Sequence, residues 1–194
     1  MIRLAFIGSS MIAGKFAEAV QLLPDTYTLD TIYSRAEETG RSFADQYGFT
    51  HVVTSLETLA ETSSVDAVYI ASPNICHFAQ CKLMLEHGKH VICEKPLTTA
   101  LDEEKELFAL AKEKHLILLE AMRPAFDPST QVVMDNLERL GTIRRVDLPY
   151  CQYSSRYDKF KEGIVTNIFN PAMGGGALFD LGIYPIYYLA MFMG

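Results

Sequence analysis

Short apolar segments alternate with longer amphipathic segments along the first 120 residues. The short segments have the length of strands, and the longer ones repeat apolar positions at helical spacing. The expected strands are residues 3–7, 27–33, 49–53, 65–70, 90–93 and 116–119. The expected helices are 15–23, 36–47, 55–61, 78–86 and 101–114, with Ser55 capping the third and Thr98 or Thr99 the fifth. Six strands alternating with helices predict an α/β fold with a doubly wound parallel sheet.

The pattern changes near Glu120, so we expect a first domain of residues 1–120 and a second of 121–194. In the second, Ser129 can cap a helix that runs to Leu140 and ends at Gly141, and residues 142–153 predict a strand. Residues 154–173 predict a long loop. One strand cannot make a sheet, so the second domain is expected to be incomplete.

A glycine turn follows the first predicted strand directly. Gly8, Ser10 and Ala13 match the pattern G-x-G-x-x-G/A, with Ser10 in place of the second glycine. The amino terminus of the next helix offers N–H groups and partial positive charge to a pyrophosphate. Ser10 either weakens phosphate binding or donates a hydroxyl hydrogen bond, and a turn without a ligand is the alternative. The candidate pyrophosphate-binding residues are Gly8, Ser9, Ser10, Met11, Ile12 and Ala13.

The second predicted strand, 27–33, is followed by Ser34 and Arg35. An acidic residue here would bind the ribose 2′-hydroxyl of NAD, whereas a hydroxyl and an arginine suit the 2′-phosphate of NADP. The sequence therefore favours NADP. The alternatives are NAD, with Arg35 stacking on the adenine, or an arginine that is only solvated.

Two further strands place polar residues at the same edge of the sheet. The strand 65–70 is followed by Ser72-Pro73-Asn74 and His77, and the strand 90–93 by Glu94-Lys95-Pro96. Ligands of open α/β sheets bind outside the carboxyl ends of the strands, so these residues are candidates for contact with a cofactor or substrate. The alternatives are a salt-bridged Lys95 and a His77 that only packs against its helix.

Composition narrows the class of partner. A formal net charge of −7 argues against binding to nucleic acid or acidic membranes, and a small molecule is the expected partner. The four cysteines form no Cys-x-x-Cys pair, which favours a reduced cytoplasmic protein without a metal site. The most apolar segment, 178–193, contains Asp180 and Pro185 and is shorter than the roughly 20 residues that span a bilayer.

These motifs together resemble the Gfo/Idh/MocA oxidoreductase family. The segment from Gly174 to Pro185 resembles that family's second signature, in the version of the dimeric dihydrodiol dehydrogenase branch. The resemblance implies a Rossmann domain, and hydride transfer between NADP or NAD and a hydroxyl or carbonyl carbon of a sugar, cyclitol or diol. It also implies a second α+β domain with an open, mostly antiparallel sheet that often forms a homodimer. Family members exceed 300 residues, so the chain is expected to be truncated in that domain.

The resemblance and the chemistry of hydride transfer suggest residue roles. Asn74, with Pro73 and Glu94, would shape the nicotinamide-ribose end of the site, and Lys95 would reach the substrate oxygen. Tyr184 would donate the proton, because a nearby cation stabilises its phenolate. Asp180, four residues before Tyr184, would share its helix face and orient it. Tyr184 as a core aromatic, and a nucleotide-binding sensor or remnant without turnover, are the alternatives.

Overall fold

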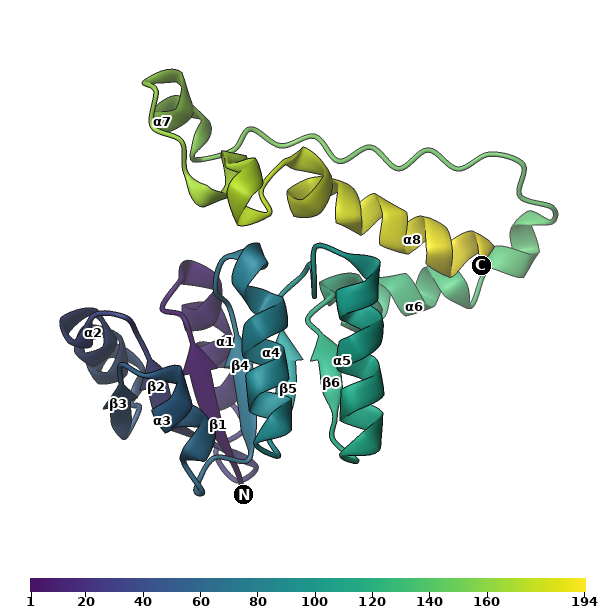
Figure 1. Ribbon diagram of the computed structural model, residues 1–194. Helices are drawn as coiled ribbons and strands as arrows, with labels where there is room; N and C mark the ends of the chain where they lie inside the picture. Colours follow the sequence, from purple (N-terminus) through teal and green to yellow (C-terminus); the bar gives the residue numbers. More distant parts are fainter. The chain divides into compact units, whose positions relative to one another are not determined.

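Parallel pairing of six strands organises the first part of the chain (Figure 1). The computed structural model describes residues 1–194, which divide into two compact units, Met1–Glu120 and Ala121–Gly194. The sheet of the first unit has the order β3-β2-β1-β4-β5-β6. Its strands are β1 (Ile2–Ile7), β2 (Tyr27–Tyr33), β3 (His51–Val53), β4 (Ala67–Ile70), β5 (His90–Cys93) and β6 (Leu118–Glu120). The predicted doubly wound parallel sheet is confirmed.

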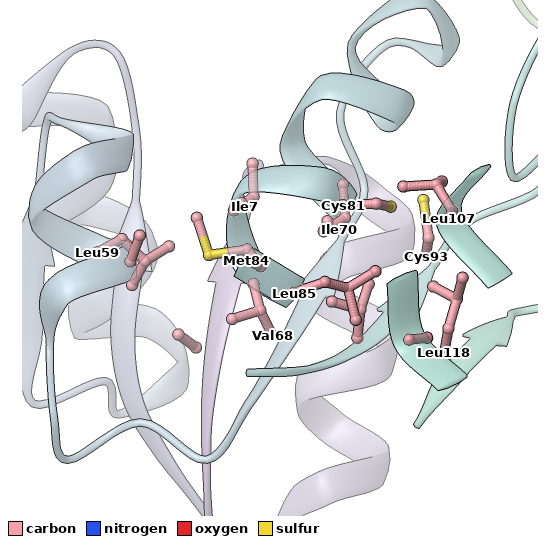
Figure 2. Close-up of a cluster of buried hydrophobic side chains, with 14 of the residues drawn as sticks. Ile7, Leu59, Val68, Ile70, Cys81, Met84, Leu85, Cys93, Leu107 and Leu118 are labelled. Atoms are coloured by element: carbon pink, nitrogen blue, oxygen red, sulfur yellow. The ribbon is translucent and has the colours of Figure 1, made fainter. Parts of the chain in front are cut away.

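Five helices connect these strands and cover both faces of the sheet. They are α1 (Met11–Gln21), α2 (Glu37–Tyr47), α3 (Leu56–Glu61), α4 (His77–Glu86) and α5 (Leu101–Glu113). Successive strand residues point to opposite faces. Ala5 and Ile7 join the buried cluster that α3, α4 and α5 complete (Figure 2). Phe6 points to the other face, where its ring contacts Phe16 of α1. Both faces of β1 are therefore buried.

The ends of two helices differ from the sequence prediction. Helix α1 begins at Met11, earlier than expected, because Ser10 is its N-cap and accepts from the Ala13 amide at 3.4 Å. Helix α5 has Ala100 as its N-cap without a side-chain bond. The Thr98 hydroxyl instead donates to the Ala100 carbonyl at 2.8 Å, so the predicted threonine cap is wrong. The predicted Ser55 cap is confirmed, since its hydroxyl accepts from the Thr58 amide.

The second unit is helical. Its elements are η2 (Arg123–Phe126), α6 (Pro128–Met134), η3 (Leu137–Leu140), α7 (Tyr157–Lys161), η4 (Asn167–Phe169), η5 (Pro171–Met173), the π-helical turn η6 (Leu178–Gly182) and α8 (Ile183–Met193). Asp127, not Ser129, caps α6 and accepts from the Ser129 amide at 2.9 Å. The helix predicted to reach Leu140 ends at Met134. A separate 3₁₀ turn, η3, covers Leu137–Leu140. The predicted loop 154–173 contains α7 and two 3₁₀ turns.

The strand predicted at 142–153 is absent, and the unit contains no sheet. A strand requires a neighbour for its backbone N–H and carbonyl groups, and residues 121–194 provide none. The alternation of Val146, Leu148 and Tyr150 gives the side-chain pattern of a strand, but it supplies no partner for the backbone. The segment Pro171–Met193, of mean hydropathy 1.3, is long and apolar enough to cross a membrane by length and composition alone. Core helices of soluble proteins pass the same test, so it assigns no location.

Lys89 offers a test of how the first unit is held together. The side chain is 7% exposed, and its ammonium donates to the carbonyls of Thr62 and Val65 at 2.7 and 2.8 Å. Replacing it with methionine (Lys89→Met) leaves both carbonyls without this donor, so we expect a loss of about 2 kcal/mol in the free energy of unfolding in urea. Lys114→Met removes an exposed lysine and should change it little. Equal stability of the two variants would contradict this role.

Candidate active site

The loops that carry the sequence motifs begin side by side at one edge of the sheet. Ile7, the last residue of β1, pairs with Tyr33 of β2 and Ile70 of β4. Ile70 pairs in turn with Cys93 of β5, and Cys93 with Glu120 of β6. Since all strands are parallel, the loops after β1, β2, β4 and β5 leave from the same level.

Gly8 closes the gap between the loops after β1 and β4. Its φ is +103°, which favours glycine, and a Cβ built there would lie 2.7 Å from the Ala71 carbonyl oxygen. A side chain at position 8 would push these loops apart at the point where the strand order reverses. This is the tight turn that the first glycine of a dinucleotide-binding loop provides.

The amino terminus of α1 follows this turn. Ser10 uses its hydroxyl oxygen as the helix cap, which leaves the hydroxyl hydrogen to donate elsewhere. Ala13, at the third glycine position of the motif, is fully buried, as close helix-to-sheet packing requires. Met11 and Ile12 are the first residues of the helix, whose N–H groups have no intrahelical partner. Met11 is exposed and Ile12 half-buried.

The two residues after β2 are in different environments. Ser34 is only 9% exposed, and its amide donates to the Val53 carbonyl at 3.1 Å. Gly40 of α2 packs against it, because a Cβ at position 40 would lie 3.1 Å from the Ser34 Cβ. Arg35 is exposed. Of this predicted pair, Arg35 is therefore the side chain more accessible to a ligand.

The loop that carries Lys95 is fixed on both sides of the lysine. Before it, the Glu94 amide donates to the Ile70 carbonyl at 2.8 Å, and the Tyr69 hydroxyl donates to the Glu94 carboxylate at 2.6 Å. After it, the Leu97 amide donates to the Glu120 carboxylate at 2.8 Å. The Lys95–Pro96 peptide is cis. The three hydrogen bonds limit the positions that the Lys95 backbone can take.

The sequence analysis missed two residues that hold this loop, Tyr69 and Glu120. Burial, and then the Glu94 carboxylate, raises the pKa of Tyr69, so its hydroxyl stays protonated and donates. Burial also raises the pKa of Glu120, against the hydrogen bond from Leu97 that lowers it. Glu120 is the last residue of β6. A charged residue at the carboxyl end of a strand is the signal that identified Lys95, and it could have identified Glu120 as well. Tyr69 lies within an apolar strand, and nothing in the sequence distinguishes it from a core aromatic.

His77 lies beneath the site. Its side chain is fully buried, with Nδ1 2.8 Å from the Pro96 carbonyl oxygen and Nε2 3.0 Å from the Ser72 carbonyl oxygen. Burial lowers the pKa of His77, against the opposing effects of these two carbonyls and of Glu94. Both ring nitrogens face the protein's own backbone, so the expected direct contact between His77 and a ligand is corrected. Ser72 and Pro73 are half-buried, and Asn74 begins the 3₁₀ turn η1 (Asn74–Cys76).

Asp180 and Tyr184 lie in the second unit. Asp180 is in the π-helical turn, and Tyr184 is the second residue of α8. Pro185 lacks an N–H and its ring crowds the carbonyl four residues earlier, which explains the wider turn before α8. The predicted four-residue stacking of the two side chains is therefore altered by that turn. The Tyr184 ring stacks on Tyr150, with 5.5 Å between centroids.

The three glycines before this turn have a local explanation. A Cβ at Gly175 would collide with the backbone of residues 167–170, and the Gly176 amide donates to the Ile168 carbonyl at 2.8 Å. Gly176 also has a φ of +132°. The chain's own backbone therefore occupies the space at Gly175, so local packing explains the glycine at this position.

Gly8 and Gly48 form a matched pair for testing the turn after β1. Both have positive φ, but nothing lies within 4 Å of a Cβ at Gly48. We expect Gly48→Ala to show backbone strain of about 1 kcal/mol in urea unfolding, and Gly8→Ala to lose at least about 1 kcal/mol more through the collision with Ala71. Equal losses would show that the loops after β1 and β4 are not in close contact.

Comparisons with known proteins agree with this geometry. A family model described as an oxidoreductase family with an NAD-binding Rossmann fold matches residues 2–122. The chain is 41% identical over 194 residues to scyllo-inositol 2-dehydrogenase (NADP(+)) IolU of Bacillus subtilis, covering 100% of the chain and 59% of the relative. It is 28% identical to trans-1,2-dihydrobenzene-1,2-diol dehydrogenase of Sus scrofa, covering 100% of the chain and 56% of the relative.

A solved structure agrees over the whole chain. The 3-ketoreductase KijD10 of Actinomadura kijaniata, in complex with NADP and TDP-benzene, is 32% identical, with a TM-score of 0.81. The match covers 100% of this chain and 57% of KijD10. The chain thus spans somewhat more than half the length of these relatives. The resemblance inferred from the motifs is confirmed, and the chain belongs to the Gfo/Idh/MocA oxidoreductase family.

Proposed function

We propose that the chain is the NADP-binding part of a dehydrogenase or reductase that interconverts a CH–OH group and a carbonyl. The observation that carries this proposal is the convergence of four motif loops at the carboxyl edge of the sheet, with Lys95 in a loop fixed on both sides. A fixed cation next to a dinucleotide site is what alkoxide stabilisation requires. The family supports the same reaction class.

The residues present fit a dinucleotide. The turn at Gly8 leaves no room for a Cβ, and the amino terminus of α1 supplies N–H groups for the pyrophosphate. Arg35 would pair with the 2′-phosphate of NADP, with Ser34 as a minor partner. The bound dinucleotide supplies or accepts the hydride. IolU, which is named for NADP(+), and KijD10, whose structure is a complex with NADP, support this preference.

The chain's own residues then have distinct tasks. Lys95 donates a hydrogen bond to the substrate oxygen and stabilises the negative charge that develops on it. Asn74, Pro73 and Glu94 shape the nicotinamide-ribose end, and Pro96 carries the backbone on from the lysine. From the second unit, Tyr184 transfers the proton as general acid or base, and Asp180 orients it.

The names of the relatives support a substrate class. IolU is named for a cyclitol, the Sus scrofa enzyme for a diol, and KijD10 is a ketoreductase. We propose a polyhydroxylated ring, with scyllo-inositol as the first compound to test. Cytoplasmic location, a homodimer and the absence of nucleic-acid or membrane partners stay predictions from sequence.

Titration with NADPH and with NADH, followed by nucleotide fluorescence, tests the cofactor. We expect Arg35→Ala to weaken NADPH binding about tenfold or more through loss of a charge-assisted bond, and to change NADH binding little. Arg41→Ala is the control, because Arg41 is exposed and paired with Glu37. Equal losses for both nucleotides would favour NAD, and no binding of either would contradict the function.

Turnover of scyllo-inositol with NADP tests the catalytic roles. Lys95→Ala and Tyr184→Phe should each lower kcat about 100-fold or more and leave the NADPH Kd unchanged, because both act on the reacting oxygen. Tyr187→Phe removes a second phenol from α8 and should keep activity. Full activity of either of the first two variants would remove that residue from the mechanism. Nucleotide binding without turnover of any polyol or its ketone would favour the sensor alternative.

A further inference from the structure

One buried imidazole joins two loops of the candidate site. Ser72 lies in the loop after β4, and Pro96 lies in the loop after β5. The ring of His77, at the start of α4, has one nitrogen at hydrogen-bonding distance from the carbonyl of each. No part of the side chain is exposed. The ring therefore reaches both loops from inside the protein.

Each of the two loops is held by another hydrogen bond besides its contact with His77. The Ser72 hydroxyl donates to the Gln80 side chain at 2.6 Å, and the Leu97 amide is held by Glu120. His77 places one ring nitrogen beside a backbone carbonyl in each loop, and its tautomer decides which carbonyl receives the hydrogen bond. A buried carbonyl that loses its donor is destabilised, so removing the ring should loosen both loops. A neutral imidazole donates to one carbonyl at a time and an imidazolium to both.

We propose that His77 is a positioning residue that couples the loop of Ser72 and Asn74 to the loop of Lys95, so that the two keep one mutual geometry. This rests on the proposed function, in which Asn74 serves the cofactor and Lys95 the substrate. His77 itself touches neither, since its ring is enclosed by the protein. Its effect on the reaction is transmitted through the carbonyls of Ser72 and Pro96.

Two conservative variants separate the two contacts. The amide nitrogen of asparagine is as many bonds from Cα as Nδ1 of histidine, which faces Pro96. The amide nitrogen of glutamine is as many bonds from Cα as Nε2 of histidine, which faces Ser72. His77→Asn thus keeps a donor for the lysine loop, and His77→Gln keeps one for the loop of Ser72.

Amide hydrogen exchange reads each loop without nucleotide or turnover. The Leu97 amide, bonded to Glu120, reports on the lysine loop, and the Cys76 amide, bonded to the Pro73 carbonyl at 2.8 Å, reports on the other. We expect exchange about fivefold to tenfold faster at Leu97 in His77→Gln and at Cys76 in His77→Asn, as loss of one hydrogen bond predicts. Met84→Ala, a fully buried change in the same helix, should lower the Tm without this selectivity.

Binding and kinetics give the second readout. His77→Asn should raise the NADPH Kd with little change in kcat, and His77→Gln should lower kcat with little change in Kd. Equal effects of both variants on both loops, or the pattern of Met84→Ala at a matched loss of Tm, would overturn the proposal. Failure of the unmodified chain to bind NADPH would contradict the proposed function alone, because the exchange experiment would still show whether His77 couples the loops.

Discussion

The parallel pairing of β1 with strands on both sides is the constraint on which the rest of the first unit depends. β1 pairs with β2 on one side and β4 on the other, and α1 and α4 leave toward opposite faces of the sheet. Because crossovers between parallel strands are right-handed, this reversal puts the carboxyl ends of β1 and β4 at the point in the sheet where open α/β folds bind their ligands. Gly8 and Ala71 meet where the two loops depart. The position of the candidate site is thus determined by the order of the strands.

Burial of polar groups determines how firmly that site is held. Tyr69, His77, Gln80 and Glu120 lie wholly or partly inside the first unit, where an unsatisfied polar atom costs about 1–3 kcal/mol. Each has a partner in the loops after β4 and β5. A movement of either loop that breaks one of these hydrogen bonds would leave a buried polar group unsatisfied. The network therefore favours one arrangement of the loops.

The sequence predicted the first unit well because its signals are local. Apolar runs of strand length, together with caps such as Ser55 and the glycine turn, identified all six strands and five helices. The prediction failed where two residues compete for one task, as at Thr98 and Ala100, or where a partner is needed from outside the segment, as at 142–153. The motif loops were found because they follow strands directly. Tyr69 was missed because its role depends on Glu94, which lies 25 positions later and becomes a neighbour only through the β4–β5 pairing.

The Tyr69 hydroxyl has a consequence for how this protein can change its sequence. The ring is packed between Phe6 and Phe16 like any core aromatic, with centroids 5.0 and 4.1 Å away, yet its oxygen reaches Glu94 beside the lysine. A phenylalanine would fill nearly the same volume but would leave the Glu94 carboxylate without this donor. The difference between tyrosine and phenylalanine at this core position is therefore one hydrogen bond to the neighbouring loop, which packing alone does not reveal.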